Sequence, residues 1–304
     1  MFRSILVPLD GSEFAEVAIP PALSIASRAG ASLELLRVHE LYTLHDPHAC
    51  WIPYEPDEDA RFRANEQAYL DVTAKRLQTG ASIHVTSTLV DGLIEDAILE
   101  SARTRLPDLV VMAIHGRGPL GRLCFGSVAE KFLLQRSAPL LLVRRGKPPV
   151  GQRPEPAFKR ILIPLDGSQV AETVLEPAVA LGTLSNSEYT LVRVVPASRF
   201  LDGFAVMADP NAIDEGCEQR KAEARGYLDG VAARLLDKGL RVQTRVVVGR
   251  SPCAAILDDV RAGHVDLIAI ATHRRSVLQR LFVGCVADGV TTHSTVPVLV
   301  FCPA

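Results

Sequence analysis

The sequence contains the same segments twice, and this duplication constrains the fold more than any other feature. The segment ILVPLDGS at residues 5–12 returns 156 residues later as ILIPLDGS at residues 161–168. DLVVMAIH at residues 108–115 returns as DLIAIATH at residues 266–273. Solenoid repeats are only ~20–50 residues long, so a repeat of this length indicates a duplicated domain. The 304-residue length agrees, since one domain takes ~150 residues.

A stretch rich in Pro and Gly separates the two copies. Its sequence, GKPPVGQRPEP at residues 146–156, can hold neither a helix interior nor a central strand. We therefore predict a first domain at residues 1–146, a linker at 147–157 and a second domain at 158–304.

Within each copy, short apolar runs alternate with segments of helical periodicity. Runs rich in Val, Ile and Leu are typical of strands buried on both faces of a parallel sheet. The alternation predicts an α/β fold with two tandem open-sheet domains, each a five-stranded parallel sheet with helices on both faces. Pro20 and Pro21 are expected to kink or stop the first helix. The expected strands are 5–9, 33–38, 83–90, 109–114 and 140–143, then 161–165, 189–195, 242–248, 267–271 and 298–301; the expected helices of the first copy are 13–28, 60–78, 93–105 and 128–136.

Composition narrows the class of protein. With 48% apolar and 22% charged residues, both copies can form hydrophobic cores. The net charge is −2, so the chain lacks the excess of basic residues that is typical of proteins that bind nucleic acids or membrane surfaces. The start of the sequence runs directly into a core-like strand, and six cysteines are spread singly without a CxxC pair. We expect a soluble, unprocessed, cytoplasmic protein whose thiols are free and mostly buried.

Ligands of open parallel sheets bind outside the carboxyl ends of the strands, where the strand order reverses. The positions to inspect are therefore Asp10, His39, Asp91 and the run from Ala113 onward. That run, AIHGRGPLGRLCFGSV at residues 113–128, combines glycines, arginines and the start of a new helix, as a phosphate site requires. A mobile βα loop followed by an N-capped helix is the alternative interpretation.

These motifs resemble a tandem universal stress protein of the UspA-like kind, with the resemblance covering residues 1–145 and 158–303. It implies an adenine nucleotide alpha hydrolase-like fold. Each half begins with a strand that ends Pro-Leu-Asp-Gly-Ser. The nucleotide-binding branch of that family carries Gly-x2-Gly-x9-Gly-(Ser/Thr), which is similar to Ala113-x2-Gly116-x9-Gly126-Ser127 here. The spacing matches, but the first Gly is Ala113, whose backbone can still approach a nucleotide if its φ is negative.

The resemblance implies ATP, with or without Mg²⁺, as the ligand of the first copy. Pro8 and Asp10 would line the adenine and ribose side, and Val38 would contact the adenosine. Residues 112–116 would wrap the ribose and phosphates, and Gly126, Ser127 and Val128 would offer N–H groups and a hydroxyl to the phosphates. Asp10 has an alternative role as a helix cap. The full set of predicted binding residues is Pro8, Asp10, Val38, Met112, Ala113, His115, Gly116, Arg117, Gly126, Ser127 and Val128.

The second copy departs from the signature. Arg274 replaces the second Gly, and Gly284 is followed by Cys285 in place of the hydroxyl residue. We expect no ATP there. Arg274 and Arg275 either neutralise the helix start, bind a smaller anion or are simply solvated.

Two further motifs suggest other chemistry. His115 and His273 occupy the same place in both copies, but no Walker lysine or Ser-His-Asp spacing accompanies them, so we expect no catalysis beyond a weak ATPase. His45-x2-His48-x-Cys50 could begin a zinc site, although its insert from residue 39 to 59 is a better candidate for a lid or docking loop.

Three functions remain open from the sequence: a stress-response sensor or regulator that binds an adenine nucleotide in the first copy, a nucleotide-independent interaction protein, and a weak nucleotide hydrolase. The resemblance also suggests that the two copies pair through their last strands, 140–143 and 298–301. Crosslinks that place these strands far apart would contradict this pairing. Whether two chains then form a homo-oligomer is left open.

Overall fold

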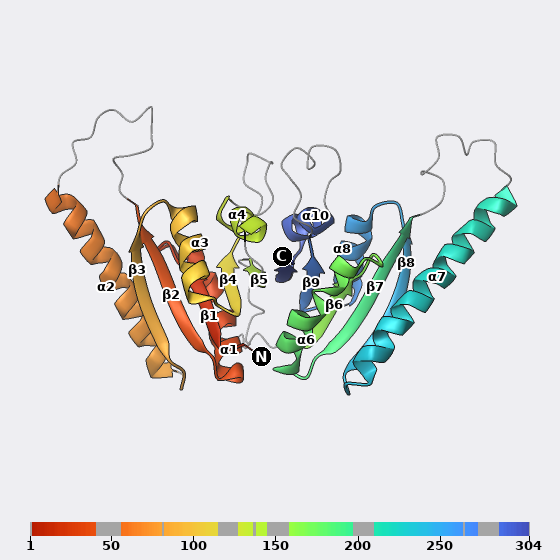
Figure 1. Ribbon diagram of the computed structural model, residues 1–304, viewed down its shortest axis with the longest axis horizontal. Helices are drawn as coiled ribbons and strands as arrows, with labels where there is room; N and C mark the ends of the chain where they lie inside the picture. The colour runs from red at the N-terminus through yellow and green to blue at the C-terminus, as the bar shows by residue number, and fades with distance from the viewer. Residues whose placement is uncertain are drawn as a thin grey trace, which may run out of the picture. The chain divides into compact units, whose positions relative to one another are not determined.

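The computed structural model describes residues 2–40, 56–80, 82–114, 127–135, 138–144, 158–196, 210–263, 265–272 and 286–303. The chain divides into two compact units, Met1–Pro156 and Ala157–Pro303, called unit 1 and unit 2 below (Figure 1). The predicted linker lies outside the described residues.

Each unit is built on a parallel sheet in which the strand order reverses once. Unit 1 has the order β3-β2-β1-β4-β5, and unit 2 has the same order as β8-β7-β6-β9-β10. The strands of unit 1 are β1 (Ser4–Pro8), β2 (Ser32–His39), β3 (Val85–Asp91), β4 (Leu109–Ala113) and β5 (Leu140–Val143). Those of unit 2 are β6 (Arg160–Pro164), β7 (Glu188–Pro196), β8 (Arg241–Gly249), β9 (Leu267–Ala271) and β10 (Val298–Phe301). The α/β fold class expected from the alternation is thus confirmed.

Helices connect the strands by crossovers. In unit 1 the chain moves from β1 through β2 to β3 at one end of the strand order, and then returns past β1 to β4 and β5. Because such crossovers are right-handed, the two helices before β3 cover one face and the two after it cover the opposite face. Unit 1 contains the 3₁₀ turn η1 (Ala15–Ala18), α1 (Ile19–Ala29), α2 (Pro56–Gly80), α3 (Ile94–Arg105) and α4 (Ser127–Gln135). Unit 2 contains α5 (Gln169–Glu172), α6 (Leu175–Thr183), α7 (Pro210–Leu236), α8 (Pro252–Gly263) and α10 (Val286–His293).

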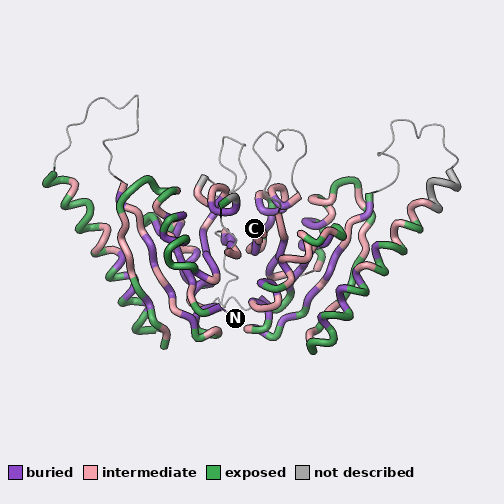
Figure 2. Tube along the Cα trace, in the orientation of Figure 1, coloured by how far each residue is buried: buried purple, intermediate pink, exposed green. Residues whose placement is uncertain are grey.

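The core of each unit lies on the central strands (Figure 2). Leu6 on β1 and Leu162 on β6 are 1% and 0% exposed. Strands β3 and β8 differ from the expectation, because most of their residues are half-buried or exposed. Each stands at one end of the strand order of its unit, next to β2 or β7. An apolar run alone does not distinguish this edge position from the centre.

Pro20 and Pro21 neither stop nor kink a helix that has already formed. They occupy the first turn of α1, which follows directly on η1. The first helical turn has no intrahelical acceptor for its N–H groups, so the missing donor of Pro costs nothing there. The prediction that these prolines kink or stop the helix was therefore wrong, since they lie at the start of α1.

A half-buried aspartate fixes the start of the first strand in both units. Asp108 Oδ2 accepts hydrogen bonds from the backbone N–H groups of Arg3 (2.7 Å) and Ser4 (3.0 Å). Asp266 Oδ2 does the same for Lys159 (3.0 Å) and Arg160 (2.9 Å). These contacts help to fix the register of β1 against β4 and of β6 against β9.

Among the helices that the structure describes, none has a stretch long and apolar enough to cross a bilayer. Of the cysteines in the described ranges, Cys217, Cys253 and Cys302 form no disulfide. Only Cys302 is fully buried, so the expectation of mostly buried thiols does not hold for these three.

Candidate functional site

The reversal of strand order in unit 1 falls between β1 and β4. The parallel pairing of Leu6 with Val110 brings the carboxyl ends of these strands, at Pro8 and Ala113, to one edge of the sheet. From there α1 and α4 lie on opposite faces of the sheet, and ligands of open parallel sheets bind outside the strand ends at such a reversal. Four predicted residues, Pro8, Asp10, Met112 and Ala113, therefore meet at this edge.

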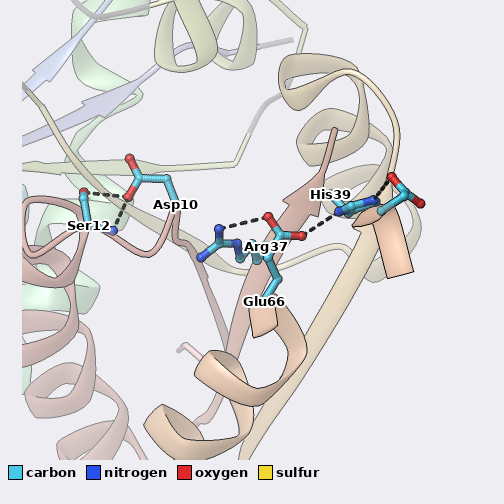
Figure 3. A network of polar contacts seen from close by, with 6 residues as sticks. Asp10, Ser12, Arg37, His39 and Glu66 are labelled. Carbon is cyan, nitrogen blue, oxygen red and sulfur yellow. Dashed lines mark hydrogen bonds and ion pairs between the residues drawn. The ribbon is translucent and has the colours of Figure 1, made fainter. Parts of the chain in front are cut away.

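Asp10 shapes the turn that leaves β1. Its Oδ1 accepts hydrogen bonds from Ser12 N (2.8 Å) and Ser12 Oγ (2.6 Å), as Figure 3 shows. Between them Gly11 adopts a φ of +84°, the left-handed region that favours glycine. Ser12 Oγ then accepts from Ala15 N (3.1 Å) at the start of η1. Ser12 Oγ, and not Asp10, thus accepts from the first N–H of η1, so the helix-cap alternative for Asp10 does not apply.

The second carboxylate oxygen of Asp10 is available to a ligand. Asp10 is exposed, and within the described part of the chain its Oδ2 accepts no hydrogen bond from a protein group. A carboxylate oxygen in this state is an acceptor for hydroxyl groups and repels phosphates.

The end of β4 has an ordinary strand backbone. Ala113 is half-buried and pairs with Val143 on β5. The non-glycine residues with positive φ in the described ranges are Leu106 and Asn186, so Ala113 has a negative φ. The condition under which Ala can replace the first signature Gly is therefore met. Met112 is 5% exposed, and Val38 on β2 is half-buried.

The remaining predicted binding residues are placed only in part. His115, Gly116, Arg117 and Gly126 lie outside the described residues. Ser127 begins α4, and Val128 in its first turn is half-buried. His45, His48 and Cys50 of the zinc alternative, and His273, Arg274, Arg275, Gly284 and Cys285 of the second copy, also lie outside the described residues.

An arginine on the second strand lies against the turn after the first strand in both units. A Cβ added at Gly11 would collide with the guanidinium of Arg37, and one at Gly167 would meet that of Arg193 at 3.1 Å. Gly167 also has a left-handed φ, of +93°. Arg37 stacks on the ring of Tyr69, 5.5 Å from its centroid, and Arg193 stacks on Tyr227 at 5.1 Å.

The tyrosine hydroxyls tie the long helix to the helical turn after β1. Tyr69 donates to Glu16 Oε1 (2.9 Å), while Arg76 donates to Glu16 Oε2 (3.0 Å). Burial, together with the bond and charge of Glu16, raises the pKa of Tyr69 to about 12. In unit 2, Tyr227 and Arg234 bind Glu172 in the same way, and the pKa of Tyr227 is also raised. This frame is common to both units.

One further group occurs in unit 1 alone. His39, 3% exposed at the end of β2, lies between two carboxylates of α2. Its Nδ1 is 2.7 Å from Glu66 Oε2, and its Nε2 is 3.1 Å from Asp59 Oδ1. Burial alone lowers the pKa of His39, but the hydrogen bonds and charges of Glu66 and Asp59 outweigh it, so the pKa is raised above 6.5.

Glu66 joins this histidine to the turn after β1. Its other oxygen, Oε1, accepts from Arg37 Nη2 at 2.9 Å (Figure 3). In unit 2 the repeat places Val195 where unit 1 has His39, and Ala224 where it has Glu66. Both replacements are buried, at 4% and 1% exposure.

The sequence interpretation missed this network. It named His39 as a position after a strand and as the start of the insert, without its carboxylate partners. In the ranges that the structure describes, no group of three or more His, Cys, Asp or Glu suited to a metal occurs. A comparison of the two repeats could have found the network, because the polar pair His39 and Glu66 of the first copy is an apolar pair, Val195 and Ala224, in the second.

The Universal stress protein family model matches this sequence twice, at residues 1–144 and 157–301. The chain belongs to the universal stress protein family. Both units are therefore universal stress protein domains in tandem.

Other members of the universal stress protein family match either one unit or most of the chain. A protein from Methanocaldococcus jannaschii is 28% identical over 47% of this chain and 94% of its own length. One from Mycobacterium bovis is 27% identical over 82% of this chain and 79% of its own. A crystal structure from Archaeoglobus fulgidus shares the fold, with a TM-score of 0.72 at 20% identity over 99% of this chain and 98% of that one.

Proposed function

We propose that unit 1 binds ATP or a related adenine nucleotide, with Mg²⁺, as the sensor of a stress-response regulator, and that unit 2 does not. The exposed Asp10 carboxylate at the point of strand reversal carries this proposal. It stands beside the end of β4, from which the Ala113-x2-Gly116-x9-Gly126-Ser127 spacing continues.

The chemistry of the edge orients the ligand. Asp10 Oδ2 accepts hydrogen bonds from ribose hydroxyls and repels phosphates, so the sugar lies beside β1. Pro8 and Val38 offer apolar contact to the adenine. The phosphates then lie toward the start of α4, where free N–H groups and the helix dipole favour anions. His115, Gly116 and Arg117 belong to the same phosphate region by sequence.

Mg²⁺ fits this arrangement through the phosphates. It keeps several waters and binds phosphate oxygens with one or two carboxylates, so it requires no dedicated protein cage. Since Asp10 faces the ribose in this arrangement, waters and the phosphates themselves would supply the ligands of Mg²⁺.

The second unit repeats the Asp166 turn but carries a different loop sequence. Asp166 Oδ1 accepts from Ser168 N at 2.8 Å, as Asp10 does from Ser12. However, Arg274 replaces a signature Gly, and Cys285 replaces the phosphate-binding hydroxyl. The added side chain and the lost donor both oppose nucleotide binding there.

Calorimetric titration of the full chain with ATP and Mg²⁺ tests the proposal. We expect a stoichiometry of about one per chain, and an affinity that falls about tenfold or more in Gly126→Val. Gly284→Val, the matched change in the second copy, should leave binding unaltered. Two equivalent sites, or no binding, would contradict the proposal. A parallel titration with cyclic AMP shows whether the terminal phosphates are needed.

Ala113 favours a second candidate function, a nucleotide-independent interaction protein, because the signature is already imperfect there. Adenine nucleotide released from the purified protein on mild denaturation, detected by mass spectrometry, would count against it. Phosphate release from ATP is expected to stay at the buffer background, and a steady Mg²⁺-dependent rate would instead support a hydrolase.

A further inference from the structure

Four positions on the long helix and the neighbouring strand end change charge between the two units. In unit 1 three of them are carboxylates that contact basic side chains, and the fourth is apolar: Asp59, Glu66, Asp91 and Phe62. The repeat replaces them, in that order, by Cys217, Ala224, Val248 and Arg220. The formal charge of the four positions thus changes from −3 to +1. This part of the fold is acidic in unit 1 and basic in unit 2.

Arg193 on β7 has lost the acid partner of its counterpart. Arg37 pairs with Glu66 at 2.9 Å, but Ala224 stands at the equivalent place in unit 2. In the described part of the chain no carboxylate pairs with Arg193, and its half-buried guanidinium contacts the ring of Tyr227 instead. Its positive charge is therefore held beside α7 without a counter-charge of its own in those ranges.

The guanidinium of Arg220 is enclosed along one edge. Its Nε and Nη2 atoms are both buried, and neither has a hydrogen-bond partner among the described residues. These two nitrogens carry N–H bonds that run side by side in the plane of the guanidinium, and the pair is called the Arg220 fork below. Such a fork binds two oxygens of a phosphate or carboxylate at once. Burial of charged donors without an acceptor costs free energy, which a bound anion would return.

Helix geometry places both arginines along one face of α7. Arg220 precedes Tyr227 by seven residues, which is close to two turns, so the two lie on the same face. Ala224 between them is 1% exposed, so this face is turned inward. Because α7 starts on the side of the strand carboxyl ends and runs back along β7, Arg220 lies nearer those ends than Tyr227 does (Figure 1). Arg193 stacks on Tyr227 and therefore belongs to the same face.

Two carboxylates of unit 2 lie near Tyr227. Burial, the bond to Glu172 and the charges of Glu172 and Asp166 together raise the pKa of Tyr227. Neither carboxylate pairs with Arg193 or with the Arg220 fork in the described ranges. Both repel anions, so an anion on this face is favoured on the side of Arg220.

We propose that unit 2 carries an anion site of its own, in which the Arg220 fork and the charge of Arg193 bind the phosphate group of a small phosphate ester. Two guanidinium charges match a phosphate monoester, which carries about −1.5 to −2 at pH 7. A carboxylate would fill the fork but balance only one of the two charges. Unit 1 has Phe62 and Glu66 at the equivalent positions and lacks this site. The site does not depend on nucleotide binding by unit 1.

Proton–nitrogen NMR of the full chain, in a buffer free of phosphate and sulfate, observes the fork directly. The Nε–H resonance of Arg220 is the one missing from Arg220→Gln. Glucose 6-phosphate should move it to lower field and saturate it with a Kd of about 1 mM or below, because the N–H then donates to phosphate. This measurement uses the wild-type chain and stands independently of any variant's folding. No saturable shift up to about 10 mM ligand would overturn the site.

Three variants separate the fork from simple positive charge, with binding followed by the backbone amides of residues 216–228. Arg220→Gln should weaken binding about tenfold or more. Arg220→Lys keeps the charge but has no fork, so it should lose most of the affinity as well. Arg225→Gln removes an exposed arginine of the same helix and should change binding by about twofold or less. Equal losses in Arg225→Gln and Arg220→Gln, or full affinity in Arg220→Lys, would overturn the fork.

Matched ligands test the chemical class and the choice of unit. Glucose should not move the Arg220 resonance, and succinate should bind more weakly than glucose 6-phosphate. Tighter binding of succinate would overturn the assignment to phosphate. The amides around Phe62 in unit 1 should not respond to glucose 6-phosphate. An equal response of both units would overturn the assignment to unit 2.

Discussion

The two units attach equivalent long helices, α2 and α7, to their sheets by different contacts. In unit 1, His39 and Glu66 form a charged cluster with Arg37, whereas in unit 2 Val195 and Ala224 occupy the equivalent buried positions. The Glu16–Tyr69–Arg76 frame and its counterpart Glu172–Tyr227–Arg234 are otherwise alike. Apolar contacts do not titrate. At these positions the contact between the long helix and the sheet therefore depends on pH in unit 1 and does not in unit 2, which serves as the reference.

The largest expected effect tests whether the shared core is equally important in both units. Leu6→Ala and Leu162→Ala remove fully buried side chains at equivalent positions, and each should cost about 2–5 kcal/mol of unfolding free energy. Urea unfolding followed by hydrogen exchange of each unit gives the two values. Costs that differ by more than the spread of such substitutions would break the equivalence of the cores.

Glu66→Ala should have the next largest effect. It removes the common acceptor of His39 and Arg37, and leaves a buried ring nitrogen without its partner, at a cost of about 1–3 kcal/mol. His39→Val in the same background should recover part of this loss, because the pair then matches unit 2. A double-mutant cycle measures the coupling, and strictly additive costs would show that the two residues act separately.

The pH dependence of unfolding distinguishes the units without any substitution. The folded-state pKa of His39 is raised, so its contribution is complete below about pH 6.5 and is lost as pH rises through the folded value. Unit 1 should therefore weaken relative to unit 2 on the alkaline side, by less than the loss of Glu66 costs. Parallel changes in both units across this range would argue against a special role for His39.

The smallest effect is expected at the exposed ends of the common frame. Arg76 and Arg234 are more than half exposed, so their ion pairs with Glu16 and Glu172 contribute only about 0–1 kcal/mol. Arg76→Ala and Arg234→Ala should shift the unfolding midpoint equally and slightly. A clear difference between them would mean that the frames are less alike than their contacts indicate.

The duplicated sequence predicted the parallel sheets well because strand runs such as 109–114 and 267–271 are short, apolar and repeated. It could not tell that β3 and β8 stand at one end of the strand order of their units, since strand order depends on contacts distant in sequence. Pro20 and Pro21 were misinterpreted because a 3₁₀ turn before them moves the helix start.

The site was predicted less completely than the fold. Asp10 was found from its place after a strand, but its choice of Ser12 as a partner depends on the left-handed Gly11. The His39 cluster joins β2 to a helix whose residues lie 20 and 27 positions away, a link that periodicity does not show. The roles of His115, Gly116, Arg117 and Gly126 remain sequence predictions.

The pairing of β1 with β4 has a consequence for synthesis of the chain. The strand made first is the central one, and its second neighbour follows more than a hundred residues later. At ~5–20 residues per second, β1 waits several seconds with an open hydrogen-bonding edge after leaving the ribosome. The same delay recurs for β6 and β9. Each half thus passes through a stage in which its central strand is exposed on one side.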